Sequence, residues 1–130
     1  MSTIDTTFET LRSQGRKAFL PFVTAGDPNL EFTGKVLQEL VARGASLCEL
    51  GIPYSDPIAD GPVIQASYTR VLDQKQKLAN IFEAASQWTS ALSAPIVSMV
   101  SHSIIHRQGL ENYVARAKTC LLYTSDAADE

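Results

Sequence analysis

Two acidic residues, Glu49 and Asp60, have the surroundings expected of side chains that transfer protons. Glu49 lies in the apolar run of residues 47–50, which predicts a buried strand, and an acid there is costly unless it is paired or its pKa rises. Asp60 follows eleven residues later, after a loop made rigid by Pro53 and Pro57. Two carboxylates in different environments can divide proton donation and acceptance between them.

Both acids also have a structural alternative. Glu49 could pair with a buried Arg or Lys, because structural ion pairs also place acids in strands. Asp60 could cap a helix that begins near Pro62, where an acid and a proline are both favoured. Composition and spacing leave these alternatives open.

The segment from Glu49 to Gly61 resembles the signature of the tryptophan synthase alpha subunit, although Cys48, just before it, stands where a branched aliphatic residue is usual. Residues 19–28 resemble that family's first strand and the loop that follows it, in the same order and at the expected separation. The resemblance implies a (β/α)8 TIM barrel. It also implies a lyase that cleaves indole-3-glycerol phosphate to indole and glyceraldehyde 3-phosphate by a retro-aldol reaction, in L-tryptophan biosynthesis.

The same resemblance implies roles for individual residues. Glu49 would be the general acid/base on the glycerol side, Asp60 would handle the proton of the indole nitrogen, and Phe22 would pack on the indole ring. Taken alone, Phe22 would more simply belong to the core. Asp56 and Pro57, in the loop of residues 54–59, would contribute to the surface that docks a partner.

That partner would be the beta subunit, in an alpha2beta2 tetramer. The pyridoxal phosphate would belong to the beta subunit, and this chain is expected to hold no cofactor and no metal. Residues 101–106 depart from the family, which often has a tyrosine followed by asparagine and proline there; contacts with indole and with the beta subunit are therefore in question. Two alternatives remain open: another phosphate-binding TIM-barrel enzyme, and a non-catalytic alpha-like activator of the beta subunit.

The elements that must position these residues alternate between strand and helix, which indicates an α/β fold with parallel strands. Strands are predicted at residues 18–24, 45–50 and 95–100. Helices are predicted around Phe8 and Leu11, and at residues 27–44, 62–72, 81–92 and 109–118. These elements make about three βα units. A closed barrel takes about 250 residues, so we expect an open part of a barrel with little lyase activity of its own.

Composition excludes several classes of protein. The chain has 130 residues, of which 45% are hydrophobic and 19% are charged, as in a single soluble domain. Its net charge of −3, without a basic cluster, gives no support for nucleic-acid binding. No apolar run approaches the roughly 20 residues that cross a membrane, and the polar start lacks a signal-peptide core; we expect a cytoplasmic protein. Two cysteines, Cys48 and Cys120, indicate neither a disulfide framework nor a metal site.

The last residues, 120–130, abandon the helical pattern and resemble the translation of an adapter DNA used in sequencing libraries. We therefore divide the chain into a partial TIM-barrel domain at residues 1–119 and an adapter-like tail from Cys120 to Glu130. The tail contains Asp126, Asp129 and Glu130. Without these three, 11 acidic residues balance 11 basic ones, so the acidic character of the chain comes from its tail.

Overall fold

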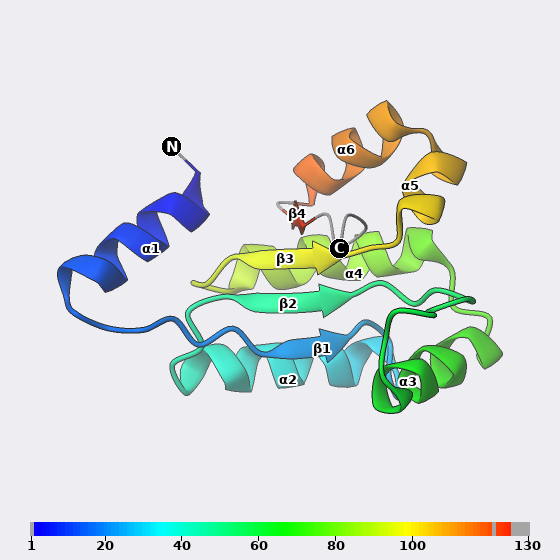
Figure 1. Cartoon of the computed structure of the whole chain (residues 1–130), viewed down its shortest axis with the longest axis horizontal. Coiled ribbons are helices and arrows are strands. Elements are labelled where there is room, and N and C mark those ends of the chain that lie inside the picture. Colours follow the sequence, from blue (N-terminus) through cyan, green and yellow to red (C-terminus); the bar gives the residue numbers. More distant parts are fainter. Residues whose placement is uncertain (1, 121, 126–130) are drawn as a thin grey trace.

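A four-stranded parallel sheet forms the centre of the chain in the computed structural model, which describes residues 2–120 and 122–125 (Figure 1). The strands follow one another in chain order: β1 Phe22–Thr24, β2 Cys48–Gly51, β3 Ile96–Met99 and β4 Leu122–Ser125. The helices are α1 Thr3–Ser13, α2 Leu30–Ala42, α3 Pro62–Asp73, α4 Leu78–Ala91, α5 His102–Gln108 and α6 Leu110–Thr119. Parallel neighbours joined by helical crossovers confirm the predicted class, an open part of a (β/α)8 barrel.

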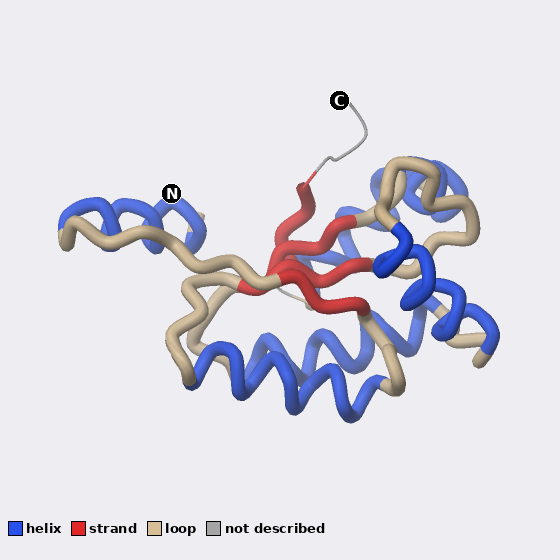
Figure 2. Tube along the Cα trace, turned by 60° about the horizontal axis from the view of Figure 1, so that its bottom comes forward, coloured by secondary structure: helices blue, strands red, loops and turns tan. Residues whose placement is uncertain are grey.

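Helices cover one face of this sheet and build the core there. In Figure 2, α2 and α4 run along that face. The buried residues of the core cluster come from α2, α4 and α6 and from the strands they cover, and include Leu37, Phe82, Tyr113, Leu50 and Ile96. The row of side chains that points toward the helices is therefore removed from water, as expected for a parallel sheet.

The other face of the sheet is open, because four strands do not close a barrel. Phe22 pairs with Glu49 across the first two strands, and Glu49 pairs with Val97 across the next two. Val97 pairs in turn with Tyr123. Side chains that are register partners point to the same face, and all four of these residues are half-buried. In a closed barrel this row would face the interior.

The first strand is shorter than predicted. The sequence pattern extends it over residues 18–24 and places Phe22 near its end, whereas β1 begins at Phe22. The residues before it make only isolated bonds to the neighbouring strand: the Phe19 carbonyl accepts from the Ser46 N–H and the Pro21 carbonyl from the Glu49 N–H. Proline has no N–H to donate, which interrupts the ladder at this point.

The start of α2 also differs from the prediction. The pattern places the helix start at Asp27 and Pro28, but Asn29 is the N-cap and its Oδ1 accepts from the Phe32 N–H at 2.8 Å. Asp27 is engaged elsewhere, since its carboxylate accepts two hydrogen bonds from Arg70, at 3.0 and 2.7 Å. A contact across 43 residues of sequence thus takes the acid that local capping rules would use.

Two elements were not expected. Residues 102–108, where the sequence pattern predicts no helix, form α5, and the Ser101 side chain accepts from the Ser103 N–H at its start. Leu122–Ser125, which the sequence pattern assigns to the tail, pairs in parallel with β3 as β4. Residues 121 and 126–130 of the tail lie outside the described residues. The adapter origin of the tail is a prediction about the DNA, and strand pairing does not bear on it.

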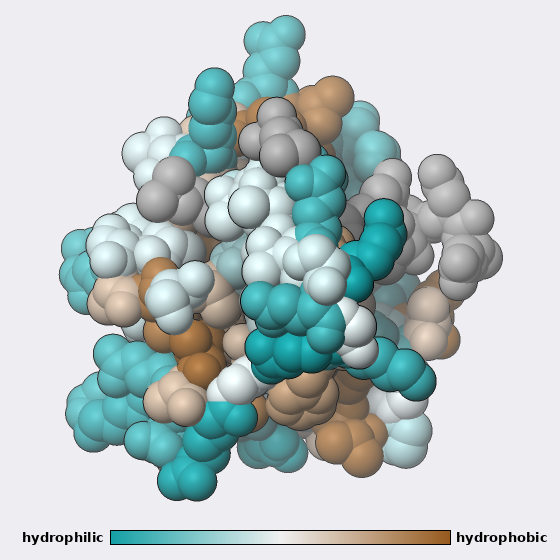
Figure 3. Space-filling model, turned by 90° about the vertical axis from the view of Figure 1, so that its left-hand side faces the viewer, coloured by the Kyte–Doolittle hydropathy of each residue, from teal (hydrophilic) through white to brown (hydrophobic). Residues whose placement is uncertain are grey.

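Helix α1 lies at the amino ends of the strands, away from the loops with the acids (Figure 1). Seen from that side, the surface is mostly hydrophilic, with smaller apolar areas (Figure 3). None of the helices in the described part of the chain is long and apolar enough to cross a membrane.

Candidate active site

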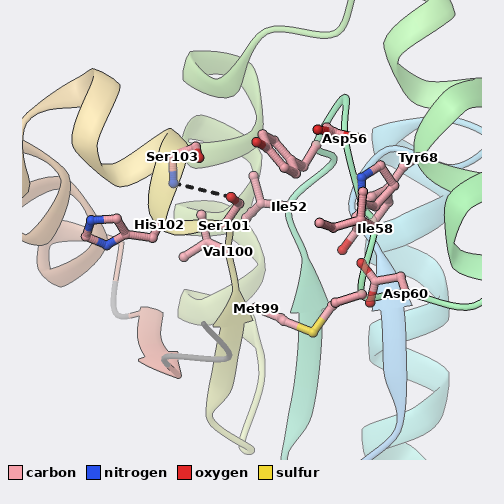
Figure 4. A pocket seen from close by; sticks show the side chains of 13 residues that line it. Ile52, Asp56, Ile58, Asp60, Tyr68, Met99, Val100, Ser101, His102 and Ser103 are labelled. Atoms are coloured by element: carbon pink, nitrogen blue, oxygen red, sulfur yellow. Dashed lines mark hydrogen bonds between the residues drawn. The ribbon is translucent and has the colours of Figure 1, made fainter. Parts of the chain in front are cut away.

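A pocket of about 330 Å³ lies beyond the carboxyl ends of β2 and β3. Three segments line it: the loop after β2, α3, and the chain that leaves β3 (Figure 4). The first two segments contribute Asp56, Pro57, Asp60 and Tyr68 to the lining, and the third contributes residues 101–103. This end of the strands carries the active site in barrel enzymes, because the loops from successive strands converge there.

Glu49 lies in β2 itself, on the open face and next to Phe22. It is half-buried, and among the described residues no Lys or Arg lies within 4.0 Å of its carboxylate. Within the described residues Glu49 therefore forms no buried structural ion pair. Glu49 and Phe22 are not among the residues that line the pocket.

Asp60 ends the loop after β2. The N-cap of α3 is Gly61, which has no side-chain cap hydrogen bond, so Asp60 does not cap the helix as the alternative required. Gln65 instead holds the backbone here, donating from Nε2 to the Asp60 carbonyl at 2.7 Å and to the Pro57 carbonyl at 3.3 Å. The half-buried carboxylate of Asp60 is left facing the pocket.

Tyr68 is a residue of the site that the sequence pattern did not indicate. It extends from α3, is 2% exposed, and lines the same pocket as Asp60 (Figure 4). Burial raises the pKa of its phenol, and the negative charges of Asp60 and Glu49 raise it further. Tyr68 thus keeps its proton throughout the physiological range.

Gly51 makes room for these side chains. A Cβ atom at this position would lie 2.4 Å from Cζ of Phe22 and 2.9 Å from the hydroxyl oxygen of Tyr68. The Phe22 ring and the Tyr68 hydroxyl therefore meet above the Gly51 backbone, two residues beyond Glu49. A glycine permits this close approach because it has no side chain.

Contacts between β1 and α3 fix the position of Tyr68. The hydroxyls of Thr24 and Ser67 lie 2.7 Å apart in a buried hydrogen bond, directly next to Tyr68 in the sequence. Arg70, two residues further along α3, forms the bidentate pair with Asp27 in the loop after β1. Bidentate arginine–carboxylate pairs set orientation as well as distance, so α3 is held in a defined rotation.

The segment that departs from the family pattern forms the opposite wall of the pocket. Ser101, His102 and Ser103 all line it, and the Ser103 N–H donates to Ser101 Oγ at 3.3 Å, as Figure 4 shows. The rings of His102 and His106 are 6.3 Å apart. Within the described residues, no group of three or more His, Cys, Asp or Glu side chains is arranged to hold a metal ion.

Fold and site together define a class of protein: an open part of a (β/α)8 barrel with two carboxylates and an aromatic side chain around the carboxyl ends of its first strands. Comparison with known proteins then gives the family. The sequence profile of the tryptophan synthase alpha chain family matches residues 8–122, so the chain belongs to this family.

Individual relatives agree with this assignment. The chain is 49% identical to the tryptophan synthase alpha chain of Rhodopirellula baltica over 120 residues, which are 90% of this chain and 43% of the relative. It is 44% identical to that of Clostridium kluyveri over 117 residues, 90% of this chain and 44% of the relative. The chain therefore spans less than half the length of these relatives.

Solved structures show the same relation. A crystal structure of the alpha subunit from Legionella pneumophila str. Paris matches with a TM-score of 0.90 at 33% identity, over 94% of this chain and 47% of the other. A tryptophan synthase complex from Pyrococcus furiosus matches with a TM-score of 0.76 at 40% identity, over 81% of this chain and 43% of the other.

Proposed function

We propose that, within a complete barrel, this chain supplies the two acids of a lyase that cleaves indole-3-glycerol phosphate to indole and glyceraldehyde 3-phosphate. The observation that carries the proposal is that Glu49, on the open face of β2, and Asp60, in the pocket beyond the carboxyl end of that strand, have no structural partner for their carboxylates among the described residues. Acids held for stability alone are normally paired. Family membership supports the same reaction.

The reaction requires two linked proton movements. Cleavage needs the tautomer of the substrate that carries a proton on indole C3. Glu49 donates this proton, and the ring nitrogen gives its own proton to the Asp60 carboxylate. The glycerol hydroxyl next to the scissile bond then loses its proton to Glu49 as the C–C bond breaks. The electron pair of that bond returns to the ring, and the nitrogen recovers its proton from Asp60. Glu49, having given the proton to C3, ends with the hydroxyl proton, so the protons balance.

The positions of the two acids suit these tasks. Glu49 is held in a strand, which gives a general acid/base a fixed position, whereas Asp60 ends a loop that can adjust to bound substrate. Phe22, the register partner of Glu49, offers an aromatic face on which an indole ring can stack. The phosphate of the substrate would be held by later loops of a complete barrel, so we expect the 130-residue chain itself to lack appreciable lyase activity.

We also propose the beta subunit as a partner, supported by the similarity to the tryptophan synthase complex from Pyrococcus furiosus. The docking surface would be the loop carrying Asp56 and Pro57. Ile58 at its tip is 87% exposed, and an apolar side chain exposed to that extent suits a contact with another protein. The beta subunit would supply the pyridoxal phosphate, and the assembly would work in the cytoplasm.

Substitution of Glu49 tests the proposed reaction. For the assay, residues 1–119 are joined to the remaining part of the Rhodopirellula baltica alpha chain; we call this protein the completed barrel. Glu49→Gln keeps the size and polarity of the side chain but removes its proton transfer, so kcat should fall by about 10²- to 10⁴-fold, measured as indole release from indole-3-glycerol phosphate.

The same variant should still raise the activity of the beta subunit, because its docking loop is unchanged. That readout serves as the control for folding. Retention of full lyase activity by Glu49→Gln would contradict the proposal and would favour the alternative of a non-catalytic activator.

A further inference from the structure

The hydroxyl of Tyr68 stands where the environments of the two acids meet. It approaches the Gly51 backbone so closely that an added Cβ would lie 2.9 Å away, and Gly51 is two residues from Glu49 on the same face of β2. Tyr68 also lines the pocket together with Asp60. One side chain, anchored on α3, thus reaches both the strand with the first acid and the loop with the second (Figure 4).

This hydroxyl is available for a functional contact. No hydrogen bond joins it to another group within the described residues, and it points into a pocket open to water. Tyr113 provides a contrast, because its hydroxyl is buried in the core between helix and sheet, near Ser98. Of these two buried tyrosines, only Tyr68 presents its hydroxyl to a cavity with carboxylates.

We propose that Tyr68 is a positioning residue whose hydroxyl, which has a single proton, donates one hydrogen bond at a time, to the carboxylate of Asp60 or to that of Glu49, during turnover. This inference rests on the proposed lyase function for its catalytic meaning. A phenol that keeps its proton donates and does not act as a base, and donation to a carboxylate favours its charged form. Tyr68 would therefore fix where the carboxylate oxygens lie at the steps in which each acid accepts a proton, Asp60 from the indole nitrogen and Glu49 from the glycerol hydroxyl.

The expected consequence is a fixed position, and with it a defined ¹³C chemical shift, for the carboxyl group that accepts the bond. Removing the hydroxyl in Tyr68→Phe should therefore move the side-chain carboxyl resonance of Asp60, of Glu49 or of both. The measurement is made by ¹³C NMR on the completed barrel described above, with indole bound. Tyr113→Phe is the matched control, since it removes the same atom from a buried tyrosine and should leave both carboxyl resonances in place.

A second measurement does not depend on how well Tyr68→Phe folds. The ¹³Cζ resonance of Tyr68 should move in Asp60→Asn and in Glu49→Gln, because each removes a negative charge near the phenol, while that of Tyr113 should stay in place. Unchanged carboxyl resonances in Tyr68→Phe, together with an unmoved Tyr68 resonance in both acid variants, would overturn the inference.

The catalytic part of the inference is tested in the completed barrel described above. We expect Tyr68→Phe to lower kcat about tenfold with little change in KM, and to change the pH–rate profile. Tyr113→Phe should match the parent. A pH–rate profile unchanged in Tyr68→Phe would also overturn it.

The two proposals fail in different ways. If Glu49→Gln retains lyase activity, the proposed reaction is wrong, whereas the NMR coupling between Tyr68 and the acids can still be observed. If Glu49→Gln is inactive and Tyr68→Phe behaves like Tyr113→Phe in every assay, the lyase function stands and the role of Tyr68 does not.

Discussion

At the scale of single residues, the two acids of the site differ in how the chain holds them. Glu49 is fixed by the ladder of β2, and Asp60 by the hydrogen bond that the Gln65 side chain donates to its backbone carbonyl, which leaves its carboxylate unengaged among the described residues. Such an arrangement keeps both side chains free for proton transfer. The lack of structural partners is therefore, together with their position, what marks Glu49 and Asp60 as candidates for proton transfer.

Asp60 offers a prediction at this scale. Asp60→Asn preserves the shape of the side chain and removes its ability to take up the proton of an indole nitrogen, so kcat of the completed barrel should fall about 10²- to 10⁴-fold. Indole release under saturating substrate measures this effect. Asp73→Asn, at the exposed end of α3, is the control and should retain parental activity; equal activities in the two variants would exclude Asp60 from the chemistry.

At the scale of elements, close packing between helices supports the sheet that carries Glu49. Helices α2 and α4 approach each other where Gly34 faces Trp88, and a Cβ atom on Gly34 would lie 2.5 Å from Nε1 of the indole ring. An ordinary glycine within a helix costs stability relative to alanine. Here the missing side chain is what allows the two helices to pack.

This contact gives a prediction for stability. Gly34→Ala should destabilise the fold by about 1–3 kcal/mol, because the added methyl group must displace Trp88, even though alanine favours helix formation. Urea denaturation followed by tryptophan fluorescence measures the loss, since Trp88 is the single tryptophan of the chain.

Gly61→Ala is the control for this substitution. Nothing lies within 4 Å of a Cβ atom at Gly61, and its φ of −72° is accessible to alanine. Its cost should stay within about 1 kcal/mol, the usual penalty for alanine at an N-cap. A Gly34→Ala variant as stable as Gly61→Ala would show that the helices can separate without cost.

At the scale of the whole molecule, the sheet has two edges, β1 and β4, and an open inner face across its four described strands. The row that contains Phe22, Glu49 and Val97 is half-buried, although in a closed barrel it would face the interior. Unpaired strand edges and apolar inner residues favour association between copies.

We therefore expect the 130-residue chain to self-associate at concentrations of about 100 μM, as measured by sedimentation velocity. Val97→Lys should reduce this association, because it places a charge on the inner face and leaves the helix-covered core untouched. The completed barrel should remain monomeric at the same concentration. A monomeric parent chain at this concentration would contradict the prediction, because it would show that the open inner face and the strand edges do not drive association.

Much of this molecule follows from local sequence. The alternation of strands and helices, the family signature between Glu49 and Gly61, and the parallel class of sheet are set by side-chain periodicity, turn residues and caps within short stretches of chain. The first and last residues of the helices and strands were less well determined by the sequence. Pro21 shortened β1, Asn29 replaced Asp27 as a helix cap, and α5 formed where no clear helical pattern was found.

The tertiary structure alone decided which distant residues share the site. Tyr68 lies beside Asp60 and Glu49 only because Arg70 pairs with Asp27, and Ser67 with Thr24, across 43 residues of sequence in each case. Periodicity reports which face of a helix is apolar, but the rotation and height of that helix against a strand depend on contacts with another part of the chain. For that reason the sequence by itself determined the family and named the two acids as candidates, whereas folding in three dimensions placed the buried tyrosine in the pocket with Asp60 and against Gly51 of the strand that carries Glu49.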